Sequence, residues 1–297
     1  MVNTIVLKSS NITDTTKNST FKYEFPNSIN FKDMELGLIS ASLYYSWFNI
    51  SDELGNRTFS YLLWENSASG GADFIQNFIT LDEGLYEIGD LNKALQFAFI
   101  EKGFYLVDTN GDNVYFAEFI VNSVKNSVDI VTYSVPTTLP SGYTAPSTWD
   151  YFYSVQTYYP LFILPTTSTF NEIIGYNTGM VTAQTFGDTA FTPRTANSIT
   201  APNVNPNSSV LVEVNIVDNP YGVPANIIYA IVPNVGVGSL IYVAPPEYAF
   251  VPIRDGVYNG LTLRLLNKDT LEPLTIQDSQ ITIILGIKEK YENTVKR

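Results

Sequence analysis

The chain contains VLVEVNIV at residues 210–217 and ITIILGI at 281–287, two runs in which apolar residues recur at every second position. Because successive side chains of a β-strand point to opposite faces, each run predicts a strand with one buried face. Four runs between them are similarly short, rich in Ile, Val, Leu and Tyr, and bounded by Pro, Gly, Asn or Asp: NIIYAIV (226–232), SLIYV (239–243), YAFVPI (248–253) and LTLRLL (261–266). This pattern is typical of strands separated by turns.

The expected inner faces of the two outermost runs are strongly apolar. They carry Val210, Val212, Val214 and Ile216 in the first run and Ile281, Ile283, Leu285 and Ile287 in the last. Six strands with no helical pattern between them need a second layer to bury these faces. The sequence therefore predicts an all-β sandwich.

The composition indicates an ordered protein that lacks the residues several enzyme classes need. Of 297 residues, 45% are hydrophobic and 14% are aromatic, far from the composition of disordered chains. This length predicts one domain with a large insertion. The chain has no cysteine and no histidine, which excludes disulfides, thiol nucleophiles, Ser-His-Asp catalysis and the HExxH zinc motif.

The net charge of −13 argues against nucleic-acid binding by the chain as a whole, because such binding depends on Lys and Arg that neutralise phosphates. The tail at 291–297 and the residues just before it mix basic with acidic side chains. We expect this tail to be solvated, with weak nucleic-acid contact as the alternative. Prolines and glycines interrupt the uncharged span 219–246, so we expect no membrane helix.

The first hundred residues predict three strands and one short amphipathic helix. Residues 1–20 are rich in Asn, Ser and Thr and are expected to form an N-terminal arm, whereas 21–25, 34–48 and 58–64 alternate as strands. The helix is indicated by an apolar stripe that consists of Leu91, Ala94, Leu95, Ala98 and Phe99.

We expect Asp90 to cap this helix at its N-terminus and Gly103 to end it. The stripe is expected to cover an open end or edge of the sandwich. Beyond the helix, dense Pro, Thr and aromatic residues replace the simple alternation. We therefore expect a discontinuous sandwich domain of 21–104 and 206–290, with a β-rich insertion domain of 105–205.

Two motifs with metal-ligand or catalytic residue types are explained better by turns and caps. Asp108, Asn110 and Asp112 have the spacing of a calcium loop, but the sixth and twelfth positions lack its glycine and its glutamate, so a hairpin turn at Asn110-Gly111 is favoured. The carboxylate pairs Asp82–Glu83 and Glu87–Asp90 could serve a glycoside hydrolase, but acids are favoured beside turns and helix starts.

The aromatic clusters Tyr151-Phe152-Tyr153 and Tyr158-Tyr159 could stack sugar rings, or they could belong to a core or to a subunit interface. We assign no catalytic, cofactor-binding or metal-binding residue, and expect no cofactor.

Three segments together resemble the penton, or minor capsid, proteins of virophages and Polinton-like viruses. They are PPEYAFVPIRDGVYNGLTLRLLNKDTLEPLTIQDSQITIILGIKEK (245–290), MELGLISASLYYSWFNIS (34–51) and GLYEIGDLNKALQFAFIEKG (84–103). The turn Ile174-Gly175-Tyr176 is similar to a further motif of that family, with Tyr in place of Phe.

The resemblance implies a single jelly-roll capsid protein without enzymatic activity. It would form homopentamers at the fivefold vertices of a virion assembled inside the host cell, beside trimers of the major capsid protein. The insertion would then face outward. A carbohydrate-binding β-sandwich that uses the aromatic insertion is the alternative, and a glycoside hydrolase is a third hypothesis.

Overall fold

The computed structural model describes residues 2–66, 72–182, 186–205 and 207–290. The chain divides into two compact units, and each has its own hydrophobic core. The sandwich unit consists of Met1–Phe48 and Asn207–Arg297, and the insertion unit consists of Asn49–Pro206.

The sandwich unit contains two antiparallel sheets. The first has the strand order β1-β18-β3-β15, with β16 also paired to β3. Its strands are β1 (Asn3–Lys8), β3 (Met34–Tyr44), β15 (Leu240–Val243), β16 (Val251–Pro252) and β18 (Thr282–Glu289). The second sheet has the order β14-β13-β17-β2. Its strands are β2 (Thr20–Phe31), β13 (Val210–Val214), β14 (Ile227–Ile231) and β17 (Gly256–Asn267), and a single 3-10 turn, Ser9–Asn11, follows β1.

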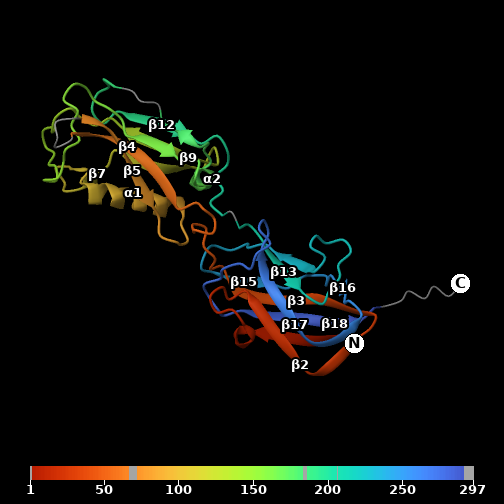
Figure 1. Ribbon diagram of the computed structural model, residues 1–297. Helices are drawn as coiled ribbons and strands as arrows, with labels where there is room; N and C mark the ends of the chain where they lie inside the picture. The colour runs from red at the N-terminus through yellow and green to blue at the C-terminus, as the bar shows by residue number, and fades with distance from the viewer. Residues whose placement is uncertain (1, 67–71, 183–185, 206, 291–297) are drawn as a thin grey trace. The chain divides into compact units, whose positions relative to one another are not determined.

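The connections between these sheets follow the jelly-roll pattern. When β16 is left aside and the remaining eight described strands are counted along the chain, the first sheet has the order 1-8-3-6 and the second 5-4-7-2. Figure 1 shows β2 and β17, which lie near opposite ends of the sequence, side by side in the second sheet. Two four-stranded sheets connected in this way form a jelly roll. The predicted fold class, an all-β jelly-roll sandwich with a β-rich insertion, is confirmed.

The alternation in the sequence predicted the inner faces of the sandwich correctly. All eight apolar positions expected to face inward are buried in one core: Val210, Val212, Val214, Ile216, Ile281, Ile283, Leu285 and Ile287. Leu36, Leu38 and Leu43 of β3, which pairs with β18 in the first sheet, belong to the same core. The run at 248–253 contributes only β16, because the segment before it is a loop.

The insertion unit is also mostly β. One sheet has the order β11-β10-β4-β5 and another β12-β9-β8, and β6 pairs with β7 in a hairpin. The strands are β4 (Thr58–Asn66), β5 (Ala72–Thr80), β6 (Leu106–Val107), β7 (Asn113–Val114), β8 (Ala117–Asn122), β9 (Ser127–Tyr133), β10 (Leu161–Leu164), β11 (Gly179–Met180) and β12 (Pro193–Asn197). The helices are α1 (Ile88–Lys102) and the five-residue α2 (Phe170–Ile174), so the structure adds a second helix to the predicted one.

Helix α1 begins three residues earlier than expected and covers a different core. Its N-cap is Glu87, and Asp90 occupies the third helical position, where its carboxylate accepts a hydrogen bond from the Glu87 N–H at 3.2 Å. Gly103 ends the helix in the left-handed conformation, as predicted. The apolar stripe packs inside the insertion unit, where Phe99 meets Tyr61 of β4 edge to face at 5.1 Å.

The domain boundaries differ from the expected ones at both ends of the sandwich. Residues 49–104, which contain β4, β5 and α1, belong to the insertion unit, because their apolar faces pack against β8, β10 and α2. The expected arm at 1–20 contains β1, which pairs with β18 and buries Ile5 and Leu7. The tail at 291–297 lies outside the described residues.

Candidate functional site

Strand β2 leaves its partner β17 in the middle of their pairing. Glu24 is paired with Gly260 and Ile29 with Tyr258, so four residues of β2, 25–28, lie opposite Asn259 alone. Pro26 lies in this segment, and its missing N–H is consistent with the interruption, since proline cannot donate to a ladder. Gly260 approaches β2 so closely that a Cβ there would overlap the carbonyl oxygen of Tyr23.

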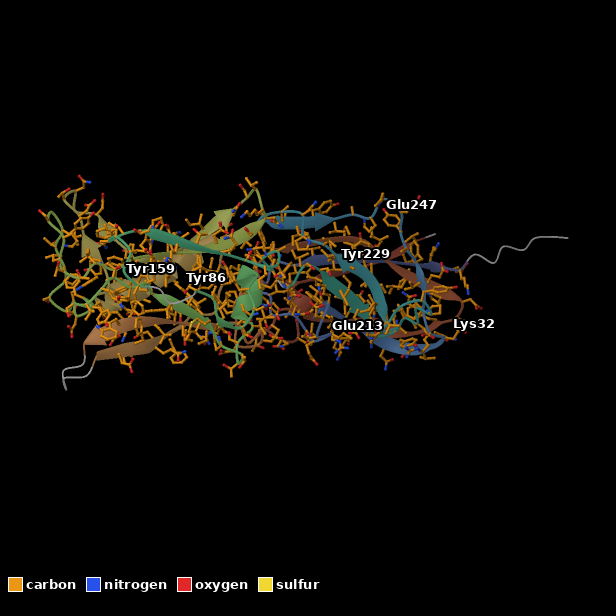
Figure 2. The ribbon with its side chains drawn as sticks, turned by 90° about the horizontal axis from the view of Figure 1, so that it is seen from above. Lys32, Tyr86, Tyr159, Glu213, Tyr229 and Glu247 are labelled. Carbon is orange, nitrogen blue, oxygen red and sulfur yellow. The ribbon has the colours of Figure 1, made fainter. Side chains whose placement is uncertain are left out.

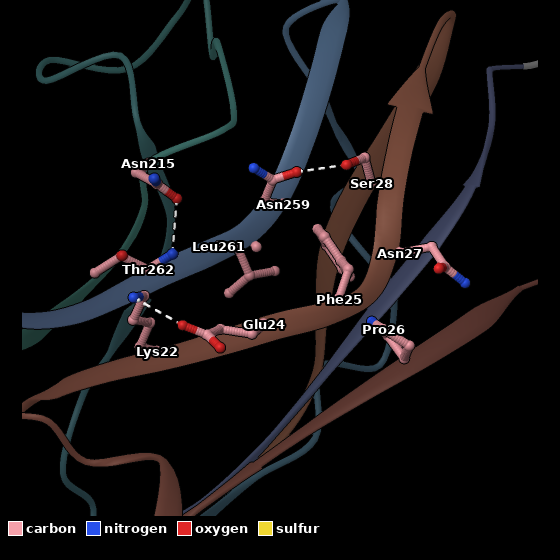
Figure 3. A pocket seen from close by; sticks show the side chains of 11 residues that line it. Lys22, Glu24, Phe25, Pro26, Asn27, Ser28, Asn215, Asn259, Leu261 and Thr262 are labelled. Atoms are coloured by element: carbon pink, nitrogen blue, oxygen red, sulfur yellow. Dashed lines mark hydrogen bonds and ion pairs between the residues drawn. The ribbon is translucent and has the colours of Figure 1, made fainter.

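The bend creates a polar hollow of about 700 Å³ on the second sheet (Figure 3). The Asn215 side-chain oxygen accepts a hydrogen bond from the Thr262 N–H at 2.8 Å, and the Asn259 oxygen accepts one from the Ser28 hydroxyl at 2.6 Å. Lys22 and Glu24 form an ion pair of 2.9 Å at one border. The two amides thus have their oxygens engaged while their NH₂ groups have no hydrogen bond within the described residues.

A second hollow, of about 350 Å³, opens at the side of the sandwich between the edge strands β1 and β2. It shares Phe25 and Pro26 with the polar hollow, so the bent segment borders both. Its other lining residues are mainly apolar: Asn3, Ile5, Tyr23, Ile29, Asn30, Phe31, Met34 and Ile287. The arrangement can accept an apolar group from outside the unit.

The loop that joins β13 to β14 exposes two large apolar side chains while its backbone is held in place. Tyr221 is 96% exposed and Val223 is 98% exposed. Asn219 fixes the loop, because its side chain donates to the Ile227 carbonyl at 3.1 Å and accepts from the Tyr221 N–H at 3.1 Å. An ordered loop that presents such side chains to solvent is typical of a contact surface.

The second sheet of the sandwich unit contains a buried charge. Glu213 of β13 is 4% exposed, and its carboxylate accepts hydrogen bonds from the side chains of Arg264 and Asn226. The carboxylate raises the pKa of the Arg264 guanidinium, chiefly through the hydrogen bond between them. Both charges are compensated, so this pair links β13 to β17 and leaves no group free for acid–base catalysis.

Several residues considered for chemistry from sequence have structural roles. The Asp108 carboxylate accepts bonds from the backbone N–H groups of Asn110 and Asp112 at 2.8 and 2.9 Å, so this motif is the predicted turn of the β6–β7 hairpin. Burial raises the pKa of the Tyr151 hydroxyl to about 12. Tyr158 and Tyr159 are buried as well, so these three rings are unavailable for stacking on a sugar.

A surface cluster in the insertion unit centres on Asp188. Its carboxylate accepts hydrogen bonds from the Tyr159 hydroxyl at 2.7 Å and from Arg194 at 2.9 Å, and these bonds lower the pKa of Asp188. The Arg194 guanidinium also lies 4.8 Å from the centre of the Tyr159 ring.

Within the described residues, no group of three or more Asp and Glu is placed to hold a metal ion.

Charge is distributed unequally between the units. The insertion unit contains 16 Asp and Glu but 5 Lys and Arg, a net charge of −11, whereas the sandwich unit contains 13 and 11, a net charge of −2.

In the insertion unit, Phe78 of β5 and Phe97 of α1 are both more than half exposed and line a hollow of about 260 Å³, with Asp82 and Glu101 also in its lining.

The sequence predicted neither the three hollows nor the exposed loop. The signal for the bend was Pro26-Asn27-Ser28 directly after the alternating run at 21–25, and the signal for the loop was Tyr221 between Pro220 and Gly222.

None of the described helices is both long and apolar enough to cross a membrane.

No family model matches the sequence, and no curated protein matches it. Among solved structures, the crystal structure of SeMet-labeled mavirus penton protein is similar to this chain, with a TM-score of 0.45 and 12% sequence identity. The match covers 97% of this chain and 99% of that chain. At this identity and TM-score, the match by itself assigns no function.

Proposed function

We propose that the chain is a structural protein of a viral capsid, without enzymatic activity, and that its sandwich unit forms pentamers at fivefold vertices of the virion. The observation that carries the proposal is the jelly-roll strand order of the sandwich unit, which is a common architecture of viral capsid domains. The resemblance of segments 34–51, 84–103 and 245–290 to penton proteins supports the same function.

Jelly rolls also occur in lectins and other proteins, so the fold by itself does not distinguish between these functions. The properties of the surface do. Five copies in a ring use heterologous contacts, in which one side of a subunit meets a different side of the next. The sandwich unit has a net charge of only −2, an apolar hollow at one side and apolar side chains exposed elsewhere. These properties favour contact between copies through this unit.

In this proposal the strongly acidic insertion unit faces outward, and neighbouring trimers of the major capsid protein surround the ring. The charge supports this placement, because like-charged surfaces of net charge −11 repel when they are brought together.

The second candidate function is carbohydrate binding. The polar hollow in Figure 3 favours it, because the amides of Asn215 and Asn259 and the ring of Phe25 are groups that recognise sugars. This candidate predicts specific binding to a glycan array by the isolated monomer, and loss of binding in Asn259→Ala.

The native mass of the purified chain, measured at low and moderate salt and followed by class averages of any oligomer, tests the capsid proposal. Five copies in a closed ring support it, and a stable trimer contradicts it. A chain that stays monomeric at both salt concentrations and binds a glycan supports the second candidate.

A further inference from the structure

We propose that the loop carrying Tyr221 and Val223 inserts into the apolar hollow between β1 and β2 of a neighbouring copy. This inference rests on the proposed ring of subunits and names the two surfaces that form its repeated contact. The occupant of the hollow is thus a second copy of the same chain.

The hollow and the loop lie on opposite sides of the sandwich unit. The second sheet has the order β14-β13-β17-β2, so β2, which lines the hollow, and β14, which follows the loop, are its two outer strands. A single copy cannot fill its own hollow with its own loop across the width of the sheet. Different surfaces on opposite sides give a heterologous contact, and such contacts form a ring when the rotation between copies closes.

Both features also lie at the same end of the sandwich. The residues at the base of the loop bond to the segment just before β17: the Arg254 N–H donates to the Ile216 carbonyl at 2.9 Å, and the Asp218 N–H donates to the Pro252 carbonyl at 2.9 Å. Strand β17 begins at Gly256, which is paired with Phe31 of the hollow. Copies arranged side by side in a ring would therefore have loop and hollow at the same level.

The two surfaces match in size and polarity. A hollow of about 350 Å³ is at the lower end of the range for ligand pockets, about 300–1,000 Å³, and suits one or two side chains rather than a large ligand. Its lining includes Ile5, Ile29 and Met34, and the loop offers the ring of Tyr221 and the branched side chain of Val223. The loop is already held by Asn219, so little conformational entropy is lost when it docks.

The charges beside the two surfaces include one pair of opposite sign. Lys32 follows Phe31 of the hollow and lies at the end of the sandwich unit, well away from Glu213 (Figure 2). Asp218 lies at the start of the loop, and both side chains are exposed. Neither forms an ion pair with any residue that the structure describes, so each is free to pair with the other across a contact between copies.

Disulfide trapping tests the contact directly, because the full chain contains no cysteine. The test variant combines Val223→Cys with Ile29→Cys. The control variant combines Ile29→Cys with Val237→Cys; Val237 precedes Gly238, whose N–H bonds to Tyr45, and so lies at the far end of β3 from Met34. The span of β3 is roughly 35 Å at about 3.3 Å per residue.

On mild oxidation, the test variant should form covalent oligomers that end at a closed ring, whereas the control variant should remain uncrosslinked. A mixture of the two single variants of the test pair should give dimers only, because each copy then has one reactive side. Trapping captures transient contacts, so the absence of crosslinks, or equal crosslinking in the control variant, overturns the inference even for a chain that is monomeric on average.

The outcomes separate this inference from the proposed function. A native mass of five copies without crosslinks keeps the pentamer and overturns the loop contact. Crosslinks in an open ladder, or in a closed ring of another size, keep the contact and overturn the pentamer.

As a second measurement, Tyr221→Ser with Val223→Ser should weaken association by at least roughly tenfold. Lys32→Glu or Asp218→Lys alone should weaken it, and their combination should restore it.

Discussion

Asn49 lies at the junction between the two units, and we predict that Asn49→Ala loosens the insertion unit while leaving the sandwich unit intact. The side chain is 5% exposed. Its NH₂ group donates to the carbonyls of Tyr86 and Val204, both at 2.7 Å, and its oxygen accepts from the Tyr86 N–H at 2.8 Å. Asn49 thus ties the beginning of the insertion unit to the segment near its end.

The expected cost follows from these three hydrogen bonds. Each contributes about 0.5–1.5 kcal/mol net, and alanine leaves two carbonyls and one N–H without a protein partner. We therefore expect a loss of about 3 kcal/mol in the free energy of opening this region, which corresponds to roughly a hundredfold faster amide exchange. The effect should stay local, because the sandwich unit has a separate core.

Hydrogen–deuterium exchange of the full chain measures this directly. The reporters are the amides of Ile50 and Gly84, which bond to each other's carbonyls at 3.1 and 3.0 Å, and amides of β18 serve as the internal reference. Asn177→Ala is the matched control, because Asn177 is exposed and should change stability by less than about 0.5 kcal/mol. An increase of less than threefold at Ile50 and Gly84, or an equal increase in β18, would refute the reasoning.

Two further predictions concern stability. Gly260→Ala should lower the stability of the sandwich unit by about 1–3 kcal/mol, because the added Cβ would overlap the backbone of the facing strand. Gly89→Ala lies in open space on α1 and should raise stability by up to about 1 kcal/mol. Urea midpoints of the two variants check both expectations, and similar midpoints would contradict the close approach at Gly260. The lowered pKa of Asp188, caused by its bonds to Tyr159 and Arg194, means that its contribution is present above the ordinary value of 3.8 and is lost as the pH falls through the lowered pKa. Asp188→Asn should therefore flatten the acid side of the stability curve below about pH 4, and an unchanged slope there would contradict this role.

The sequence predicted the inner faces of the sandwich because alternation is a local property. Val212 and Ile283 each lie at an alternate position of an apolar run, and both are buried. The partner of each strand is not a local property, and this explains the misplaced boundary. β3 and β4 alternate in similar ways, but one pairs with β18 and the other with β5, and nothing in their own residues distinguishes those partners.

The candidate surfaces were harder to predict because they depend on chain segments that are distant in sequence. The apolar hollow combines Ile5 of β1, Phe25 of β2 and Ile287 of β18, which only the folded sheets bring together. The N-terminal arm was misassigned for a related reason: β1 buries only Ile5 and Leu7 among many polar residues, and pairing with β18 outweighs its weak local preference.

The separation of charge between the units bears on which of them can hold a ring together. Contacts between insertion units would bring surfaces of net charge −11 together, and at physiological salt such repulsion is screened only beyond about 8 Å. The sandwich unit, with a net charge of −2, faces no such barrier, and Lys32 and Asp218 provide one pair of opposite charges where the proposed contact forms. Raising the salt concentration should therefore relieve repulsion between insertion units and weaken the Lys32–Asp218 attraction at once. A ring held mainly by the apolar loop would consequently change little in stability between low and moderate salt, whereas a ring held by charge would dissociate.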